Sequence, residues 1–449
     1  MINYELAMAL TDIISTVLII IIFSIAWYYI TYFALAFTKP PVAPKSDKYT
    51  KFGVLVPARN ESKVIHNIIN ALKAQTYPKE YFDVWFIIES EDDPTAEIAK
   101  KNGYHYFVRD ELTDQRRTKG FALQECIRYF KANNILYDAY MIFDADNIME
   151  KEFISKMNDV RQEGVQVGVG YRNFTNASTN WLTATSATLF VYMNTITSRG
   201  RTILFRKALL NGTGYYVDRQ IIDDAGGWIF TGLTEDTELT GYCYYHDVRM
   251  RYYPLAQFYD EQATTIKAIH NQHIRWIWGF FYNKKKVKAN KDTINYHATS
   301  KARHGAAMLE YNLGLIPMAV SMVIAFLMIV TLLVLAIISL FDAPQYSWTL
   351  FINVTTIFAF TYLLFFSIAM FTLVREKKKL NMSWATILWA SATYVLFFGA
   401  LLWAIVDGFL FPRKRKVWKA IPHDGKIKNK EAKKIAKLEK KNEKKKSKD

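Results

Sequence analysis

The sequence has few of the features that mark secreted, disulfide-linked or dinucleotide-binding proteins. Its only two cysteines, Cys126 and Cys243, have neither metal-binding nor disulfide spacing, which fits a reducing cytosolic compartment. The chain also contains no G-x-G-x-x-G and no G-x-x-x-x-G-K-[ST]. A disulfide scaffold, a dinucleotide fingerprint and a P-loop are therefore excluded as organising features.

Charged residues are nearly absent from four long segments, at 12–37, 311–340, 348–374 and 384–411. Each is longer than the roughly 20 apolar residues that cross a bilayer. No small-residue cleavage site follows the first segment, so residues 1–40 are interpreted as a transmembrane anchor and not as a signal peptide. The sequence therefore predicts a multi-pass protein of the plasma membrane with a polar middle.

The basic excess of the chain is concentrated at its C-terminal end. Residues 413–449 hold 17 Lys or Arg against 5 Asp or Glu, a surplus of 12 out of the net charge of +16. A lysine-rich run of this kind is typical of a solvated segment near anionic lipid. The lipid bilayer, and not a nucleic acid, is the partner that this charge predicts.

Basic residues next to the apolar segments predict that the polar middle faces the cytoplasm. One crossing before the middle and three after it would, however, place the lysine-rich tail outside, against the positive-inside rule. Either one C-terminal segment is re-entrant or interfacial, or the tail is exported. We favour the first alternative, in the last segment, which Asp407 and Gly408 interrupt.

The polar middle, residues 50–260, alternates short apolar strands with helical segments. Strands are predicted at 52–56, 83–90 and 139–146, and helices at 62–75 and 118–133. This alternation predicts an α/β domain with a mostly parallel sheet and helices on both faces. Ligands of such sheets bind at the carboxyl ends of the strands.

Acidic residues follow three of these predicted strands and should meet at one edge. They are Glu61, Glu89 with Asp92 and Asp93, and the pair Asp144 and Asp146. Two aspartates at i and i+2 can bind a hard divalent cation such as Mg²⁺ through oxygen, although acidic pairs in solvated turns are also common.

Two further motifs lie downstream. Thr234, Glu235 and Asp236 precede a helical stretch, where they can form an N-capping arrangement, and Asp236 can also serve as a general base. In the predicted helix 271–286, Gln272, Arg275 and Trp276 share one face. An Arg fork suits phosphate oxygens and an indole suits a sugar ring, whereas the bland alternative is an amphipathic helix on the membrane surface.

Together these motifs resemble the processive, membrane-embedded family 2 glycosyltransferases, which include cellulose, chitin, hyaluronan and poly-N-acetylglucosamine synthases. The similarity covers residues 50–280 and consists of motifs in a fixed order: VPARNES at 56–62, IIES at 87–90, Lys119-Gly120, Asp144-Ala145-Asp146, NGTG at 211–214, Thr234-Glu235-Asp236 and QHIRW at 272–276.

The resemblance implies a GT-A catalytic domain that uses a UDP-sugar and Mg²⁺ or Mn²⁺. Asp146 would ligand the metal and Asp144 would lie near the ribose or the metal, while Asp236, beside Glu235 and Thr234, would be the catalytic base. The implied donor site consists of Ala58, Arg59, Glu61, Glu89, Lys119, Asp144 and Arg275. The implied acceptor site consists of Trp276, Gly212, Thr213 and Gln272.

The resemblance further implies interface helices at 261–309 and a polymer channel formed by helices within 310–412. A gating-loop-like segment would follow, where Trp418 is kept and the usual Thr is absent, so that Lys419 is a candidate substitute. The function expected first is processive synthesis of a β-glucan from UDP-glucose, with (1,3;1,4) linkages as one form, and export of the polysaccharide. A UDP-N-acetylglucosamine-dependent or hyaluronan-like synthase and a nonprocessive membrane glycosyltransferase stay as alternatives.

Overall fold

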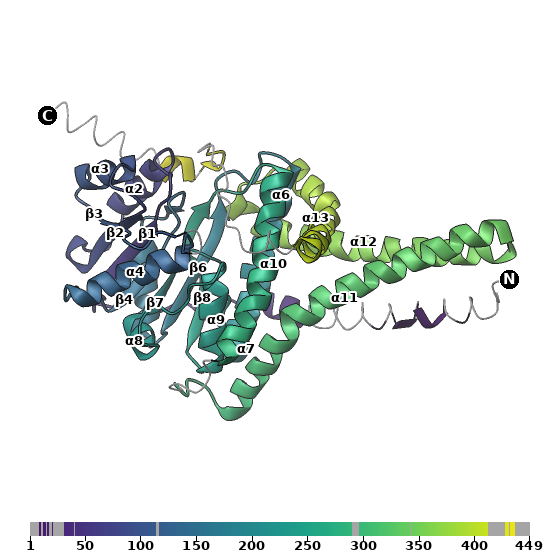
Figure 1. Cartoon of the computed structure of the whole chain (residues 1–449), viewed down its shortest axis with the longest axis horizontal. Helices are drawn as coiled ribbons and strands as arrows, with labels where there is room; N and C mark the ends of the chain where they lie inside the picture. Colours follow the sequence, from purple (N-terminus) through teal and green to yellow (C-terminus); the bar gives the residue numbers. More distant parts are fainter. Residues whose placement is uncertain are drawn as a thin grey trace.

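A computed structural model describes residues 31–39, 41–113, 116–289, 296–342, 344–411, 427–430 and 432–435, and isolated positions before residue 21. It consists of an α/β domain, which is the catalytic domain that the resemblance implies, and a long helical arm (Figure 1). The predicted N-terminal anchor falls largely outside the described residues, as do Trp418 and Lys419 of the gating-loop-like segment.

The described residues of the catalytic domain contain one sheet of eight strands in the order β3-β2-β1-β4-β7-β6-β8-β5. The strands are β1 (Phe52–Pro57), β2 (Phe82–Ile88), β3 (His105–Val108), β4 (Ala139–Ile142), β5 (Ile148–Met149), β6 (Val167–Phe174), β7 (Tyr215–Asp218) and β8 (Met250–Asp260). Strands β3, β2, β1 and β4 are mutually parallel, and β6 is parallel to β8. The mostly parallel sheet is confirmed, and the antiparallel strands β7 and β5 are additions that strand–helix alternation did not indicate.

Helices cover both faces of this sheet. The helices of the catalytic domain are α2 (Ile65–Lys73), α3 (Pro94–Lys101), α4 (Lys119–Ala132), α5 (Phe153–Gln162), α6 (Trp181–Tyr192), α7 (Arg199–Phe205), α8 (Arg219–Asp224) and α9 (Glu235–Tyr245), with the short helices η1 (Lys79–Tyr81) and η2 (Met193–Ser198). Successive residues of β1 enter different cores, Val54 and Val56 on the face of α2 and Leu55 on the face of α4. Such alternation is what a strand buried on both faces requires.

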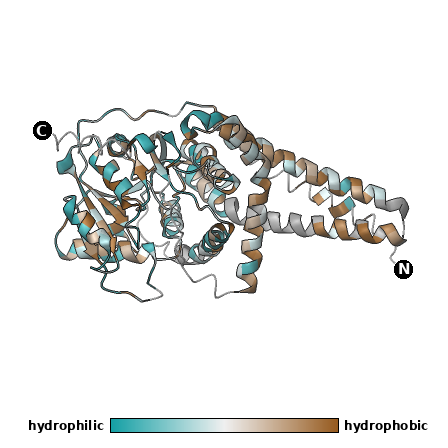
Figure 2. Ribbon diagram, turned by 90° about the horizontal axis from the view of Figure 1, so that it is seen from above, coloured by the Kyte–Doolittle hydropathy of each residue, from teal (hydrophilic) through white to brown (hydrophobic). Residues whose placement is uncertain are grey.

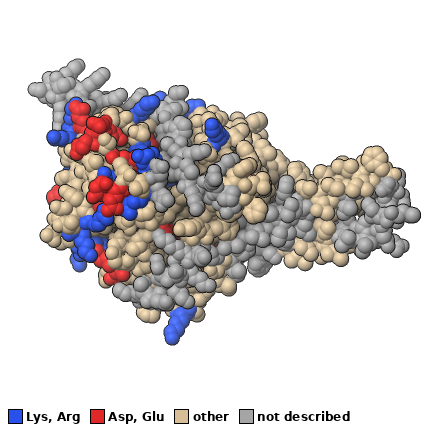
Figure 3. All heavy atoms as spheres, viewed as in Figure 1, with Lys and Arg blue, Asp and Glu red and all other residues tan. Residues whose placement is uncertain are grey.

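Four long helices follow the sheet: α10 (Ile266–Ala289), α11 (Lys301–Asp342), α12 (Pro344–Leu380) and α13 (Trp384–Leu410). Helices α11 and α12 form the arm, along whose ribbon many described residues are coloured hydrophobic (Figure 2). In the view of Figure 3, the charged side chains gather over the rest of the molecule and none is seen on the described part of the arm. Within the described residues, two helices are apolar and long enough to cross a membrane by length and composition, Trp348–Leu380 and Trp384–Leu410. Side chains at 313–329, in the predicted segment 311–340, lie outside the description.

Candidate active site

A cleft of about 510 Å³ opens at the carboxyl ends of β1, β2 and β4. Because these strands are parallel and adjacent, the loops that follow them meet at one edge of the sheet. The cleft is lined by nearly all of the residues that the sequence singled out: Ala58, Arg59, Glu61, Glu89, Lys119, Asp144, Asp146, Gly212, Thr234, Glu235, Asp236, Gln272, Arg275 and Trp276.

The D-x-D pair is held in the turn between β4 and β5. The backbone N–H of Asp144 donates to the Thr213 hydroxyl at 3.0 Å and to Asn147 Oδ1 at 3.2 Å. The Asn147 amide in turn donates to Asp146 Oδ1 at 3.1 Å and to Asp260 Oδ1 at 3.0 Å. Thr213 therefore supports the aspartate turn, although it does not belong to the cleft lining.

A third carboxylate, which the sequence reasoning missed, completes this cluster. One carboxylate oxygen each from Asp144, Asp146 and Asp260 lie within 4.8 Å of one another. Asp260 is the last residue of β8, which runs parallel to β6. The sequence could have indicated Asp260, because it is an acidic residue at the end of a largely buried strand. Three close carboxylates match the oxygen ligands of Mg²⁺ or Mn²⁺.

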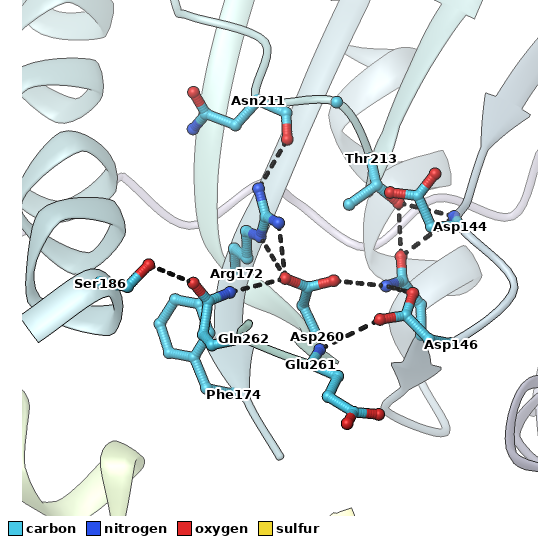
Figure 4. A network of polar contacts seen from close by, with 12 residues as sticks. Asp144, Asp146, Arg172, Phe174, Ser186, Asn211, Thr213, Asp260, Glu261 and Gln262 are labelled. Atoms are coloured by element: carbon cyan, nitrogen blue, oxygen red, sulfur yellow. Dashed lines mark hydrogen bonds and ion pairs between the residues drawn. The ribbon is translucent and has the colours of Figure 1, made fainter. Parts of the chain in front are cut away.

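The environment of Asp260 orients this third carboxylate (Figure 4). Its Oδ2 accepts from Arg172 Nε at 3.0 Å, from Arg172 Nη2 at 2.5 Å and from Gln262 Nε2 at 2.9 Å. Arg172 also donates to the Asn211 carbonyl at 2.8 Å. Oδ2 is thus held by fixed donors, and Oδ1 faces Asn147 and the D-x-D turn.

Lys119, the first residue of α4, lies between the aspartate turn and the acids of α9. Its ammonium donates to Asp144 Oδ1 at 2.5 Å and to the Gly212 carbonyl at 2.6 Å, and it lies 3.9 Å from Glu235 Oε1. Burial acts to lower the pKa of Lys119, but Asp144 and Glu235 outweigh it and the pKa is raised. The side chain is therefore a permanent cation in the centre of the cleft.

Glycine follows Lys119 because α4 begins against the loop before α9. A Cβ on Gly120 would lie 2.3 Å from the Phe230 carbonyl oxygen and 2.8 Å from Thr231 Cα. The Thr118 hydroxyl caps the helix at the Phe121 N–H and donates to the Thr231 carbonyl at 3.1 Å. The missing side chain at Gly120 therefore allows the start of α4, which carries Lys119, to pack closely against the loop before α9.

Glu235 and Asp236 begin α9 and line the cleft, where Glu235 is buried and Asp236 is half-buried. Burial raises the pKa of Glu235 to about 8, with Lys119 acting against it, and burial also raises the pKa of Asp236. A Cβ on Gly212 would lie 4.0 Å from Asp236 Oδ2, which places the predicted acceptor floor beside this carboxylate. A carboxylate with a raised pKa suits a general base.

Thr234 occupies the N-cap position of α9, but its side chain makes no capping hydrogen bond. The capping alternative of the sequence is therefore wrong for this hydroxyl, although Glu235 and Asp236 do lie in the first turn. The Thr234 hydroxyl and carbonyl accept from the Asn283 amide of α10 at 2.8 and 2.7 Å. This contact joins α9 to the helix that carries Arg275 and Trp276.

Helix α10 forms one wall of the cleft. Burial lowers the pKa of Arg275, while the negative charges of Glu235, Asp144 and Asp236 act in the opposite direction. The Trp276 ring packs edge-on against Phe190 of α6 at 5.5 Å between centroids. The helix predicted at 271–286 is confirmed, and it sets a guanidinium and an indole side by side on the cleft.

At the end of the cleft near β2, Glu89 is surrounded by arginines. Arg59 Nε lies 3.1 Å from its carboxylate, Arg109 Nη1 3.7 Å and Arg117 Nε 4.0 Å. The acids Glu89, Asp92 and Asp93 all follow β2, and the structure places them differently. Glu89 lines the cleft, whereas Asp93 caps α3 through the Thr95 N–H at 2.9 Å. The backbone N–H of Asp92 donates to the Ser90 hydroxyl, and Asp92 does not line the cleft. Arg109 and Arg117 do line the cleft, and the sequence reasoning missed both residues.

The opposite end of the cleft is apolar and comes from three helices. Its lining residues are Leu189 and Phe190 of α6, Ile277, Phe280 and Phe281 of α10, and Tyr394, Leu401 and Ile405 of α13. The cleft therefore runs from a charged edge of the sheet to a wall formed in part by one of the two helices that are apolar enough to cross a membrane.

Comparison with known proteins agrees with this geometry. Residues 50–279 match the family model described as "Glycosyltransferase like family 2". The chain is 29% identical over 241 residues to a probable glycosyltransferase, YdaM, of Bacillus subtilis, covering 52% of this chain and 56% of the relative. It is 28% identical over 238 residues to a beta-monoglucosyldiacylglycerol synthase of Trichormus variabilis, covering 50% and 48%.

A third relative, a poly-beta-1,6-N-acetyl-D-glucosamine synthase of Staphylococcus epidermidis, is 22% identical over 229 residues, covering 50% of this chain and 53% of the relative. The chain thus spans about half the length of the curated relatives that it matches. Among solved structures, the mannosyltransferase PcManGT from Pyrobaculum calidifontis, in complex with GDP-Man and Mn²⁺, superposes with a TM-score of 0.58 at 14% identity, covering 90% of this chain and 99% of that one. The protein has the GT-A fold and belongs to glycosyltransferase family 2, whose members transfer sugars from nucleotide donors.

Proposed function

We propose that this enzyme transfers a sugar from a UDP-sugar to an acceptor hydroxyl that reaches the cleft from the membrane side. The observation that carries the proposal is the continuity of the cleft, from the carboxylate cluster at the sheet edge to the wall of α6, α10 and α13. Arg59, Glu61 and Glu89 are assigned to the nucleoside end. Lys119 and Arg275 are assigned to the diphosphate, whose negative charge they would offset.

The carboxylates of Asp144, Asp146 and Asp260 would hold a divalent cation, since their oxygens converge and Arg172 already occupies the outer oxygen of Asp260. When bound, Mg²⁺ or Mn²⁺ supplies positive charge against the donor diphosphate. The mannosyltransferase with the similar fold binds Mn²⁺ together with its nucleotide sugar.

Transfer follows as an inverting displacement at the anomeric carbon. Asp236 takes the proton of the acceptor hydroxyl, whose oxygen then bonds to the anomeric carbon. The bond from that carbon to the diphosphate breaks, and the electron pair leaves with UDP. Lys119 and Arg275 stabilise the charge that develops on the departing diphosphate. Gly212 leaves the space beside Asp236 open for the acceptor.

The first acceptor we propose is the end of a growing β-glucan, with UDP-glucose as the donor. Trp276 lies on the cleft wall beside Arg275, where an indole can stack on the terminal sugar. The motif order Lys-Gly, D-x-D, T-E-D and Q-x-x-R-W, which resembles that of processive synthases, supports processive extension and export through the membrane helices. UDP-N-acetylglucosamine is the alternative donor, because a poly-N-acetylglucosamine synthase is among the relatives.

A second candidate acceptor is a lipid hydroxyl, and a specific observation favours it. The far end of the cleft is apolar on all three helices, with side chains such as Leu189, Ile277 and Leu401. An acyl chain fits such a lining better than a polar sugar chain does. A relative that bears the name of a diacylglycerol glucolipid synthase agrees with this candidate.

The test is product analysis with the purified full chain in lipid vesicles. Radiolabelled UDP-glucose, UDP-N-acetylglucosamine and UDP-glucuronate are each supplied with Mg²⁺, with and without diacylglycerol. Water-insoluble or high-molecular-mass label from UDP-glucose supports the β-glucan synthase, and label in a chloroform extract supports the lipid acceptor. Absence of transfer from every UDP-sugar, with Asp236→Asn as the blank, would overturn the proposed function.

A further inference from the structure

Helix α13 packs against the catalytic domain along its whole length, beginning with its N-terminal half. Ile387 and Ala390 share a buried core with Ala187 of α6. The Thr393 hydroxyl lies 3.0 Å from the hydroxyl of Thr185, also on α6. This half of α13 therefore rests on a helix that lines the cleft.

The C-terminal half of α13 packs against α10. The Phe397 ring meets His273 of α10 edge-on at 4.6 Å. Asp407, in the last turns, lies 2.9 Å from Nε2 of His270, and both side chains are buried. The carboxylate that interrupts the apolar segment is thus bonded to the helix that carries Arg275, and does not face open surface.

These contacts conflict with a crossing of the bilayer. At about 1.5 Å per residue, a helix of 27 residues is roughly 40 Å long, so a crossing would carry one end about 30 Å away from the domain. Both halves instead touch helices that line the cleft. In Figure 1 the ribbon of α13 is seen nearly end-on, while α11 and α12 run lengthwise across the picture.

The other face of α13 is apolar and exposed. Trp389, Leu396, Trp403 and Leu410 follow one another at intervals of seven residues, so they share a face. Their exposed fractions are 60%, 56%, 52% and 62%, and the Trp403 ring also stacks on His270 of α10 at 3.8 Å between centroids. Tryptophan lies along this face and not only at the helix ends, which is typical of helices lying in a membrane interface. The cleft-lining side chains of α13 belong to the opposite face.

Charge near α13 indicates what covers this face. Lys377, Lys378 and Lys379 precede the helix, and the Lys377 ammonium lies 4.0 Å from the Trp384 ring. Arg and Lys also occupy 413–416, directly after it. Basic residues at both ends of an apolar, tryptophan-rich face complement the anionic lipids of a cytoplasmic leaflet.

The chain beyond α13 returns to the catalytic domain. Ala432 and Ile435 join the core that also contains Val56 of β1. The backbone N–H groups of Lys428 and Asn429 both donate to the Thr175 carbonyl at 2.8 Å. The segment after α13 therefore lies on the same side as the domain, and the crossings between α10 and residue 427 are even in number.

We propose that α13 lies in the plane of the membrane surface, with its Trp389–Leu410 face among the lipid headgroups and its other face forming the acceptor wall of the cleft. Helices α11 and α12 then cross out and back, and every basic segment after the domain stays on the domain's side, as the positive-inside rule requires. This assignment does not depend on which sugar or acceptor the enzyme uses.

Spin-label depth measurements test the assignment on the full chain in vesicles. Labels are placed one at a time at 389, 396, 406 and 410, all exposed positions, and Trp403 is kept because its ring stacks on His270. The native Cys126 and Cys243 are buried and escape labelling. An in-plane helix gives four similar depths, about 5–10 Å below the surface. A crossing helix gives depths that peak near 396, about 15 Å below the nearer surface, and that fall toward 389 and 410. That profile would overturn the proposal.

Spin labels at exposed positions of α12 calibrate the depth scale for the labels on α13. The exposed positions Phe351, Phe358 and Leu363 lie on a helix that we treat as crossing, so their depths should change steadily with position. A C-terminal tag provides the second readout. Protease should remove it only from vesicles whose catalytic domain faces outward. Removal from vesicles of the opposite orientation contradicts the proposal, and UDP binding by each labelled variant verifies its fold.

Discussion

The two ends of the cleft are constructed differently. The donor end consists of charged side chains on loops after parallel strands, each tied to fixed partners, as Lys119 is to Asp144 and Asp260 is to Arg172. The acceptor end consists of apolar side chains from α6, α10 and α13, which are distant in the sequence. The end that we propose for the donor therefore offers charge at fixed positions, and the end that we propose for the acceptor offers shape and apolar surface. Substitutions in the two ends should have separable effects.

Asp236→Asn, at the junction of the two ends, should have the largest effect. It removes the proposed base but keeps the size of the side chain, so transfer should fall by about 10²–10⁴-fold while UDP binding is kept. Steady-state transfer and UDP titration measure the two quantities. The exposed Asp223→Asn on α8 is the control, since that carboxylate lies outside the cleft. Near-normal transfer by Asp236→Asn would remove this residue from its role.

Gly120→Val should damage the donor end through packing. Its Cβ would lie 2.3 Å from the Phe230 carbonyl, and overpacking of this kind costs about 1–3 kcal/mol of unfolding free energy. Thermal unfolding in detergent should show a lower Tm and a raised KM for the UDP-sugar. Gly305→Ala on α11 is the matched control, because nothing lies within 4 Å of its added Cβ. Equal Tm values for the two variants would contradict this explanation of the Lys-Gly pair.

Trp276→Ala should affect the acceptor end alone. Losing the ring surface should raise the acceptor KM by about tenfold, which corresponds to about 1.4 kcal/mol, with the UDP-sugar KM unchanged. Initial rates at varied acceptor and fixed donor measure the effect. The exposed Trp348→Ala on α12 should leave both constants unchanged. A raised KM for the donor in Trp276→Ala would mean that the two ends are not separable.

Glu235→Gln should give the smallest change. Burial raises the pKa of Glu235 to about 8, so its carboxyl is mostly neutral below that pH and glutamine resembles it. Burial also raises the pKa of Asp236, so the base loses its charge as the pH falls and the rate falls with it. The acidic limb of kcat should therefore stay in place in Glu235→Gln, and the two enzymes should differ only above about pH 8, where Glu235 becomes charged. A pH profile of each enzyme measures this, and an acidic limb that moves to lower pH in the variant would contradict a neutral Glu235.

The difference between the two ends also explains what the sequence could predict. Asp144, Asp146 and Glu89 follow apolar strands directly, and the carboxyl ends of parallel strands must meet, so their convergence could be deduced without coordinates. Asp260 was missed because it ends a strand near the far edge of the sheet, whose place depends on the antiparallel β7. The acceptor wall was missed because apolar residues on a helix have the same pattern whether they line a cleft, a core or a lipid surface.

The orientation of the C-terminal helices shows the same limit. Positive charges in the sequence conflicted with three crossings and indicated an interfacial last segment, with Asp407 as the interruption. The structure adds the physical reasons for an interfacial last helix. Asp407 contacts His270 of α10, and the chain returns to the domain core at Ala432.

Metal-dependent UDP binding is the most direct test of the donor end, on which the whole proposal depends. UDP is titrated into the purified chain with and without Mg²⁺, and into Asp146→Asn and the exposed control Asp92→Asn. We predict that Mg²⁺ strengthens binding to the wild type and to Asp92→Asn but not to Asp146→Asn, which still inserts into the membrane. UDP affinity that is independent of both Mg²⁺ and Asp146 would contradict the account.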